Sequence, residues 1–322
     1  MRPPEHWHLR RPPKRRPWPL IAVIASGVLV AVLLAVVCRA GGGDPDANVA
    51  APVDCTAEVV CTPTPAAAAY GSDSPPPPVR GLAATVIEAS CGKALYEKNA
   101  DAHLPPASLT KMMTALIAQR QADLNQVVDV DVNGALMVAS TGASIMGLEP
   151  GMRLSLLDLM YGMMLPSGND AAIQIARTVG GTEEAFVDMM NAEAQRLGMF
   201  DTSFSNPDGL DQVDLYSTAH DMALLGRAYM RVPELAEIAR APRYQPNWDR
   251  GEVLNGNELL ERYQGAIGVK TGYTELAGQT IVAAAQRGSR VLIVAVLGSY
   301  NRYADATSLF DWAFSSTRPA CD

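Results

Sequence analysis

The stretch from Trp18 to Val37 contains no charged residue and directly follows a cluster of basic residues. A helix needs about 20 mostly apolar residues to cross a bilayer. The pattern predicts a transmembrane signal anchor over residues 18–38, with the basic tail, residues 1–17, in the cytoplasm by the positive-inside rule. The alternatives are a signal peptide, although the sequence after Val37 is a poor cleavage site, and a buried helix, which rarely lacks polar residues on every side.

A segment rich in proline, alanine and glycine follows, over residues 39–79. Such a composition cannot bury enough apolar surface to offset the entropy lost on ordering, so it predicts a linker. Residues 80–316 then show the periodic patterns of a folded domain, and residues 317–322 are expected to form a tail. The domain is therefore expected outside the cytoplasm, held near the membrane.

Within residues 80–316 the apolar positions switch between the spacing of strands and that of helices. The predicted strands are 81–89, 94–97, 268–273, 280–286 and 291–297. The predicted helices are 108–120, 154–165, 170–179, 183–197 and 304–314. Because strands lie at both ends with helices between them, we expect an α/β (α+β) fold with one sheet built from both ends of the domain and covered by helices.

Composition and net charge exclude some classes of protein. The chain has 322 residues, of which 48% are hydrophobic and 19% charged, with a net charge of −8. These values exclude a disordered chain. The excess of acidic over basic residues argues against a nucleic-acid partner, because proteins that bind nucleic acids usually present a basic face.

Cysteines and histidines point to structure rather than to a metal site. Four cysteines would lie in an oxidising compartment, where three complete pairings are possible. We expect Cys91 to pair with Cys321, because the first hairpin and the closing helix should be neighbours, and Cys55 with Cys61 in the linker. Cys38, at the membrane edge, is expected to stay unpaired. His103 and His220 lack the H-E-x-x-H pattern of a zinc peptidase, and we interpret both as structural.

The first candidate for chemistry is the pair Ser108 and Lys111. Residues three apart share a helix face, so the hydroxyl and the amine can meet. A serine at a helix start is ordinarily an N-cap, but a capping box would have Glu or Gln three residues later. A serine nucleophile needs a base, and a desolvated lysine with a lowered pKa is such a base. Taken alone, the S-x-x-K pattern is weak.

Two further triplets have both a structural and a functional interpretation. Ser167-Gly168-Asn169 follows Pro166 between two helices and is either a helix cap or a proton relay with an amide that binds peptide backbone. Lys270-Thr271-Gly272 falls in a predicted strand. Its lysine is either a solvated edge charge or, with Thr271, a site for a terminal carboxylate, and its glycine suits close approach by another backbone.

Together and in this order, the three triplets match the set S-x-x-K, S-D-N and K-T-G of penicillin-binding proteins, with S-G-N in the middle place. The chain resembles the low-molecular-mass D-alanyl-D-alanine carboxypeptidases over about residues 80–315. The likeness extends beyond the triplets to the segments 105–114, 165–172, 197–199, 206–210, 217–223 and 268–274.

This resemblance implies a serine DD-peptidase of the β-lactamase-like fold, with a central antiparallel sheet and no metal or other cofactor. It assigns Ser108 as nucleophile, Lys111 as base and Ser167 as proton relay. The implied substrate-binding residues are Asn169, Lys270, Thr271, Gly272 and Tyr273, and the implied oxyanion hole is the backbone N–H groups of residues 108 and 273. Arg302 lies where many members place an arginine for the substrate carboxylate, but its alignment stays open.

The implied substrate is a peptidoglycan stem pentapeptide ending in D-Ala-D-Ala, and β-lactam antibiotics would acylate Ser108. A β-lactamase would need a glutamate for deacylation, and no Glu-x-x-Leu-Asn follows Ser167. An endopeptidase that cuts D-Ala cross-links would use the same residues. An inactive wall-binding or sensor module is the remaining alternative.

Overall fold

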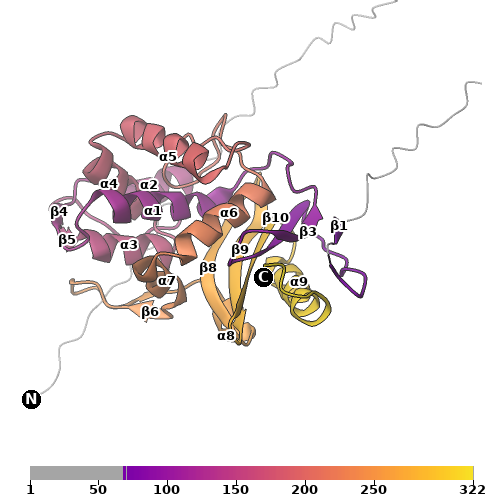
Figure 1. The fold of residues 1–322 in the computed structure, drawn as a ribbon. Coiled ribbons are helices and arrows are strands. Elements are labelled where there is room, and N and C mark those ends of the chain that lie inside the picture. The colour runs from indigo at the N-terminus through magenta and orange to yellow at the C-terminus, as the bar shows by residue number, and fades with distance from the viewer. Residues whose placement is uncertain (1–67, 70, 322) are drawn as a thin grey trace, which may run out of the picture. The chain divides into compact units, whose positions relative to one another are not determined.

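The computed structural model describes residues 68, 69 and 71–321, and Figure 1 shows their arrangement. The predicted cytoplasmic tail, the anchor over residues 18–38 and three of the five cysteines (Cys38, Cys55 and Cys61) lie outside the described residues. Within the described part of the chain, no helix is both long and apolar enough to span a bilayer.

An antiparallel sheet of six strands lies at the centre of the fold, in the order β1-β3-β2-β10-β9-β8. Its strands are β1 (Ala68–Ala69), β2 (Ala83–Glu88), β3 (Ala94–Lys98), β8 (Ala266–Thr274), β9 (Gly278–Arg287) and β10 (Arg290–Ser299). Because β10 pairs with β2, the two ends of the domain share one sheet, as the sequence predicts.

Helices and two small two-stranded sheets make up most of the remaining described chain. The helices are η1 (a 3-10 turn, Ala107–Thr110), α1 (Lys111–Gln121), α2 (Gly134–Thr141), α3 (Leu156–Met164), α4 (Asn169–Gly180), α5 (Glu183–Leu197), α6 (Ala219–Met230), α7 (Pro233–Arg240), α8 (Leu259–Arg262) and α9 (Arg302–Ser316). The small sheets pair β4 (Val127–Asp129) with β5 (Arg153–Ser155), which α2 separates in sequence, and β6 (Arg243–Tyr244) with β7 (Val253–Leu254).

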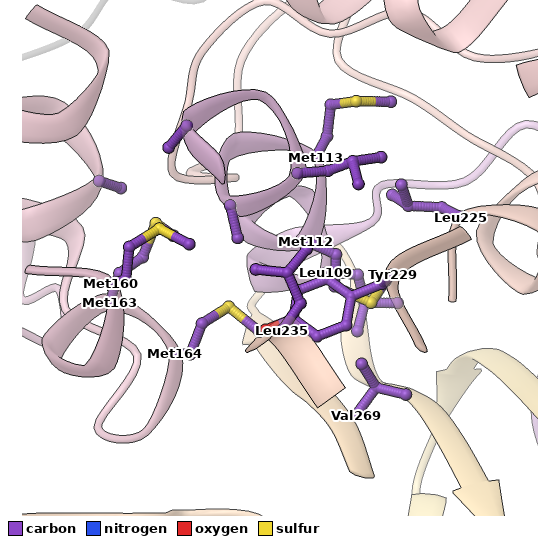
Figure 2. Packing of buried hydrophobic residues seen from close by; sticks show 14 of the residues in the cluster. Leu109, Met112, Met113, Met160, Met163, Met164, Leu225, Tyr229, Leu235 and Val269 are labelled. Carbon is purple, nitrogen blue, oxygen red and sulfur yellow. The ribbon is translucent and has the colours of Figure 1, made fainter. Parts of the chain in front are cut away.

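The sheet has a hydrophobic core on each face because side chains alternate along its strands. On β10, Leu292 and Val294 pack with α9, whereas Ile293 and Ala295 belong to the core shared with α1, α3 and α6. Figure 2 shows the second core, where Met112 and Met113 of α1 face α3 and α6. The two cores therefore fix the position of β8 within the sheet and of η1 beside it.

The fold differs from the sequence prediction in three places. The helix predicted over 108–120 begins as the 3-10 turn η1, and α1 starts only at Lys111. Helices α2, α6, α7 and α8 and the short strands β4–β7 were not predicted. Helix α2 leaves apolar residues such as Leu136 exposed, so it lacks the usual amphipathic pattern. Contacts also extend beyond residues 80–316, since β1 pairs with β3 and Ser72 bridges to Thr317.

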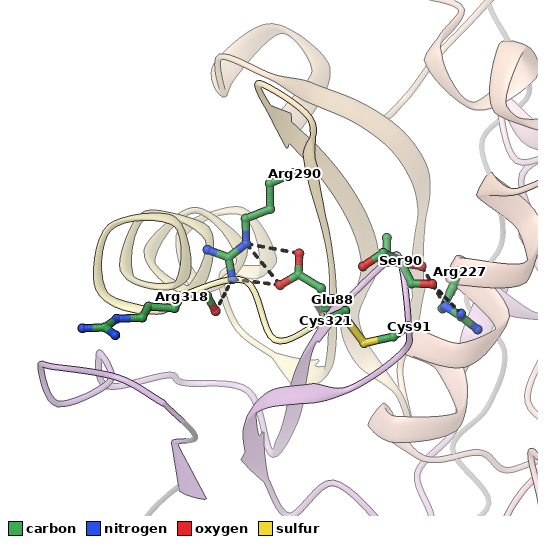
Figure 3. Close-up of a disulfide and its surroundings, with 8 residues drawn as sticks. Glu88, Ser90, Cys91, Arg227, Arg290, Arg318 and Cys321 are labelled. Atoms are coloured by element: carbon green, nitrogen blue, oxygen red, sulfur yellow. Dashed lines mark hydrogen bonds and ion pairs between the residues drawn. A yellow bond between two sulfur atoms is a disulfide. The ribbon is translucent and has the colours of Figure 1, made fainter.

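The carboxyl end of the domain is fastened to the first hairpin. Cys91, in the β2–β3 turn, forms a disulfide with Cys321, as predicted (Figure 3). Beside it, Arg290 forms a buried ion pair with Glu88 at 2.9 Å and donates to the backbone carbonyl of Thr317, also at 2.9 Å. These contacts hold the chain after α9 against β2 and β10.

Candidate active site

Ser108 and Lys111 meet at the junction of η1 and α1. The Nζ of Lys111 donates a hydrogen bond to Ser108 Oγ at 2.9 Å and another to the backbone carbonyl of Asp208 at 2.5 Å. The Lys111 side chain is completely buried, since its exposed fraction is 0%. The amine is therefore held at the hydroxyl by a fixed carbonyl.

Burial lowers the pKa of Lys111 to about 8, because the charged ammonium loses its hydration. The negative charges of Asp208 and Asp170 act in the opposite direction and raise it. A lysine with this pKa is neutral in about a tenth of the molecules at pH 7 and in about half at pH 8, so Lys111 has the property that a base for Ser108 requires.

The chain before Ser108 adopts an uncommon conformation. Ala107 has a φ of +52°, in the left-handed region that residues with a Cβ seldom occupy. Its carbonyl packs so closely on Gly209 that a Cβ there would lie 2.0 Å from the Ala107 oxygen. The neighbouring Pro106 carbonyl accepts a hydrogen bond from Thr280 Oγ1 of β9 at 3.1 Å. Contacts with Gly209 and β9 thus position the turn that carries Ser108.

The break between α3 and α4 carries Ser167 and Asn169. Ser167 has a φ of +65°, and Asn169 is the first residue of α4. The N-cap of α4 is Gly168, and no side chain caps this helix, so the interpretation of this triplet as a helix cap is wrong. Asn169 is 4% exposed, and within the described structure its Oδ1 atom has no hydrogen-bond partner. A buried amide oxygen without a partner matches a group that binds a ligand N–H.

Lys270 lies on β8, the last strand of the sheet. It is only 3% exposed, so its interpretation as a solvated edge charge is also wrong. Its Nζ donates to the carbonyl of Thr271 at 3.0 Å. Burial holds the pKa of Lys270 well below its usual value, and the charges of Lys111 and Arg302 lower it further. A bound anion would relieve this unfavourable concentration of positive charge.

Arg302, at the start of α9, joins the same group of residues. Its Nη1 donates to the Gly272 carbonyl at 2.5 Å and to the Thr280 carbonyl at 3.3 Å. Its Nε is buried without a hydrogen-bond partner in the described structure. Arg302 therefore supports β8, and its charge acts on Lys270.

One cleft of about 850 Å³ brings the predicted residues together. Its lining includes all of them except Lys111, namely Ser108, Ser167, Asn169, Lys270, Thr271, Gly272 and Tyr273, together with Arg302. Lys111 lies buried next to Ser108. A nucleophile with its base thus shares one cavity with a second serine, an amide and two cations.

Sequence reasoning missed two contributors to this site. Asp208 was expected to shape a turn, and its carboxylate does accept the Leu210 N–H at 3.0 Å, but its backbone carbonyl also holds Lys111. Asp170 had no predicted role, and its charge is among those acting on Lys111. The position of Asp208 within a segment that resembles the carboxypeptidases was the available signal.

The histidines have structural partners. His103 stacks on Tyr216 and contacts Asp201 at 3.3 Å, while His220 lies 3.5 Å from Glu97. Among the described residues, no group of three or more His, Cys, Asp or Glu side chains is arranged to hold a metal ion.

The sequence from residue 71 to residue 301 matches the family model described as D-alanyl-D-alanine carboxypeptidase. The chain belongs to the D-alanyl-D-alanine carboxypeptidase family. The match spans η1, the α3–α4 break and β8, and thus includes the three motifs of the cleft.

Curated relatives of this family come from several bacteria. The chain is 36% identical to the D-alanyl-D-alanine carboxypeptidase DacF of Bacillus subtilis over 239 residues, which is 72% of this chain and 61% of DacF. It is 39% identical to DacB2 of Mycobacterium tuberculosis, over 71% of this chain and 81% of DacB2. This chain therefore spans about three fifths of the length of DacF but four fifths of DacB2.

Solved structures show the same fold. A crystal structure of D-alanyl-D-alanine carboxypeptidase from M. tuberculosis aligns with a TM-score of 0.70 and 36% identity, covering 78% of this chain and 98% of that chain. A mutant of the Streptomyces K15 DD-transpeptidase aligns with a TM-score of 0.71 and 30% identity, covering 74% and 99%. Both are DD-peptidase folds, so the central antiparallel sheet flanked by helices, which the resemblance implied, is confirmed.

Proposed function

We propose that this protein is a serine-type D-Ala-D-Ala carboxypeptidase that removes the terminal D-alanine from peptidoglycan stem pentapeptides through an acyl-enzyme. The observation that carries the proposal is the 2.9 Å hydrogen bond from Lys111 to Ser108 Oγ, in a cleft that also holds Lys270 and Thr271. A hydroxyl with a buried amine and a cationic strand edge suits hydrolysis at the carboxyl end of a peptide.

In the acylation step, neutral Lys111 takes the proton of Ser108 while Oγ bonds to the carbonyl carbon of the penultimate D-alanine. The resulting oxyanion is stabilised by the backbone N–H groups of Ser108 and Tyr273, and such donors typically contribute about 10²–10³-fold each to the rate. As the peptide bond breaks, Ser167 passes a proton to the departing amine. Ser167 recovers its proton from the Lys111 ammonium, which becomes neutral again. Water then attacks the acyl carbon and gives a proton to Lys111, and Lys111 passes this proton to Ser108 Oγ as the ester bond breaks. Ser108, Lys111 and Ser167 thus return to their starting states.

The remaining residues bind the peptide. Lys270 and Thr271 hold the terminal carboxylate, and this ion would offset the positive charge that Lys111 and Arg302 place around Lys270. The unpartnered Oδ1 of Asn169 accepts an N–H of the peptide backbone. The edge of β8 offers its own backbone to the peptide.

The test is release of D-alanine from a pentapeptide that ends in D-Ala-D-Ala, using the full-length chain in detergent. We expect turnover by the wild type and its loss in Ser108→Ala, with a penicillin adduct on Ser108 in the wild type alone. No release by a wild-type protein that binds penicillin would exclude the carboxypeptidase. Rapid turnover of the penicillin would favour a β-lactamase, and neither activity would favour an inactive module.

A second outcome of the same acyl-enzyme is transfer to an amine, as the name of the Streptomyces relative, a DD-transpeptidase, suggests. Adding glycine as an acceptor would divert product from the free acid to the glycyl peptide if transfer competes with hydrolysis. Digestion of cross-linked muropeptides would instead indicate an endopeptidase.

The uncharged stretch from Trp18 to Val37 supports a further part of the proposal, that the enzyme is anchored in the cell membrane with its catalytic domain outside the cytoplasm. Fractionation of cells expressing the full chain should find it in the membrane, at its full mass, and accessible to protease added from outside. A soluble product shortened at its amino end would show that the segment is a cleaved signal.

A further inference from the structure

A buried carboxylate lies directly behind the S-G-N motif. Asp170 is the second residue of α4, and its side chain is completely buried. It accepts backbone N–H hydrogen bonds from Met146 at 2.8 Å, Gly147 at 2.9 Å and Leu148 at 2.8 Å, and from Ala171 at 2.9 Å. A carboxylate only accepts hydrogen bonds, whereas an amide NH₂ would oppose some of these donors. The site is thus built for a negative charge.

Two glycines make room for this charge. A Cβ on Gly134 would lie 2.6 Å from Asp170 Oδ2. A Cβ on Gly168 would lie 2.9 Å from Asp170 Oδ1 and 2.8 Å from the Met146 nitrogen. Both positions therefore need glycine for the carboxylate to reach its donors.

The segment held by Asp170 forms a wall of the cleft. Residues 142–148 follow α2, and three of them, Gly142, Ala143 and Ser144, line the cavity. The carbonyl of Ser144 accepts the backbone N–H of Asn169 at 2.9 Å. The wall and the start of α4 are therefore joined through both Asn169 and Asp170, so that a shift of the wall would also move the amide of Asn169.

The charge of Asp170 also acts on the base. The charged groups around Lys111 are Asp208 from the 206–210 turn, Asp170 from α4 and Lys270 from β8. The two acids raise the pKa of Lys111 against the larger, opposite effect of burial. Loss of either negative charge would lower that pKa further.

We propose that Asp170 is a positioning residue of the active site, which fixes the 142–148 wall against Asn169 and keeps the charge around Lys111 in balance. The inference rests on the proposed function, because it assigns Lys111 as the base. The anchoring of the 142–148 wall by Asp170 rests on its hydrogen bonds alone and does not depend on the proposed function.

The test compares Asp170→Asn with Asp221→Asn. Asp221 is a matched control because it is 3% exposed and also accepts a backbone N–H, from Asp201 at 3.0 Å, but it is not among the groups that act on Lys111. Two readouts are used, the pH dependence of acylation by a fluorescent penicillin and the hydrogen exchange of the amides of residues 146–148.

In Asp170→Asn we expect acylation at pH 7 to fall on the order of 100-fold, since small displacements in a site have effects of this size. We also expect the acid limb of the pH profile to move to lower pH by roughly half a unit or more, because an acid near Lys111 is lost. Exchange at residues 146–148 should accelerate at least tenfold, whereas Asp221→Asn should change neither the limb nor this exchange. An unmoved acid limb, or unchanged exchange, would overturn the proposal.

If Asp170→Asn does not fold, Gly134→Ala takes its place as the test variant. The added Cβ displaces the Asp170 carboxylate but leaves its negative charge near Lys111. Acylation should then fall at least tenfold with the acid limb in place, and wild-type acylation would overturn the proposal. If the wild type neither binds penicillin nor releases D-alanine, the proposed function fails. The exchange measurement then still decides whether Asp170 anchors the wall.

Discussion

A Cβ atom on Gly272 would lie 2.9 Å from the backbone nitrogen of Ser108. The same atom would lie 2.5 Å from Thr280 Oγ1 and 3.0 Å from the Cβ of Ala107. The absence of a side chain at position 272 thus lets β8 pack directly against the turn that carries the nucleophile. This contact sets the distance between Ser108 and the strand edge where the peptide is proposed to bind.

Gly272→Ala should therefore separate the two walls of the cleft. We expect kcat/KM for D-alanine release to fall on the order of 100-fold, because the nucleophile and the bound peptide lose their alignment. Steady-state kinetics with the pentapeptide measures this effect.

Gly256→Ala is the matched control for this change, because Gly256 lines the same cleft and its Cβ would meet the Leu165 carbonyl at an ordinary 3.7 Å. Its loss of kcat/KM should be at least tenfold smaller. Equal losses in the two variants would contradict the role given to the Gly272 contact.

The pH dependence of acylation should report on Lys111. The base must be neutral to take the proton of Ser108, and burial lowers its pKa to about 8. The acylation rate should therefore rise about tenfold per pH unit at low pH and level off above about pH 8. Stopped-flow measurement with a chromogenic penicillin between pH 5 and 10 checks this.

Lys111→Arg should remove this pH dependence together with nearly all acylation, because a guanidinium stays charged throughout this range. Lys93→Ala, which changes an exposed lysine of the β2–β3 turn, serves as the control and should behave like the wild type. A plateau that begins two units lower in the wild type would show that another group limits acylation.

Strands and motifs were predictable from the sequence because they depend on local patterns. The apolar runs over 280–286 and 291–297 found the buried parts of β9 and β10, which the structure extends to Gly278–Arg287 and Arg290–Ser299. The order of the three motifs located Ser108, Ser167 and Lys270, and these residues share one cleft.

Contacts made by backbone atoms were not predictable, because they leave no side-chain signature. The carbonyl of Asp208 that holds Lys111 depends on the turn around Gly209, not on the carboxylate. The positive φ of Ala107 is likewise imposed by packing against Gly209 rather than by the residue type. Tertiary contacts of this kind override local propensity, and only the assembled fold reveals them.

Loss of the Cys91–Cys321 disulfide should destabilise the domain without removing the active site. The bond closes a loop of 230 residues, so its removal adds conformational freedom mainly to the unfolded chain. We expect Cys91→Ser with Cys321→Ser to lower the free energy of unfolding by about 2–4 kcal/mol. Urea unfolding of variant and wild type, with and without a reducing agent, measures the difference, and the reductant should affect the wild type alone. An unchanged urea midpoint would mean that the contacts of Arg290 alone hold the carboxyl end of the domain in place.

The ion pair between Arg290 and Glu88 should contribute far more to stability than a surface pair. The side chains of Arg290 and Glu88 are 12% and 4% exposed, and Arg290→Ala would leave a buried carboxylate without its cation. Breaking a buried pair from one side typically costs about 3–5 kcal/mol.

Arg153→Ala is the control, because Arg153 and Asp129 are 71% and 84% exposed, and exposed pairs contribute about 0–1 kcal/mol. Arg290→Ala with Glu88→Leu should recover part of the loss, because the carboxylate is then gone as well. Unfolding energies that are equal for Arg290→Ala and Arg153→Ala would show that water reaches Glu88 and that the buried pair does not hold the carboxyl end in place.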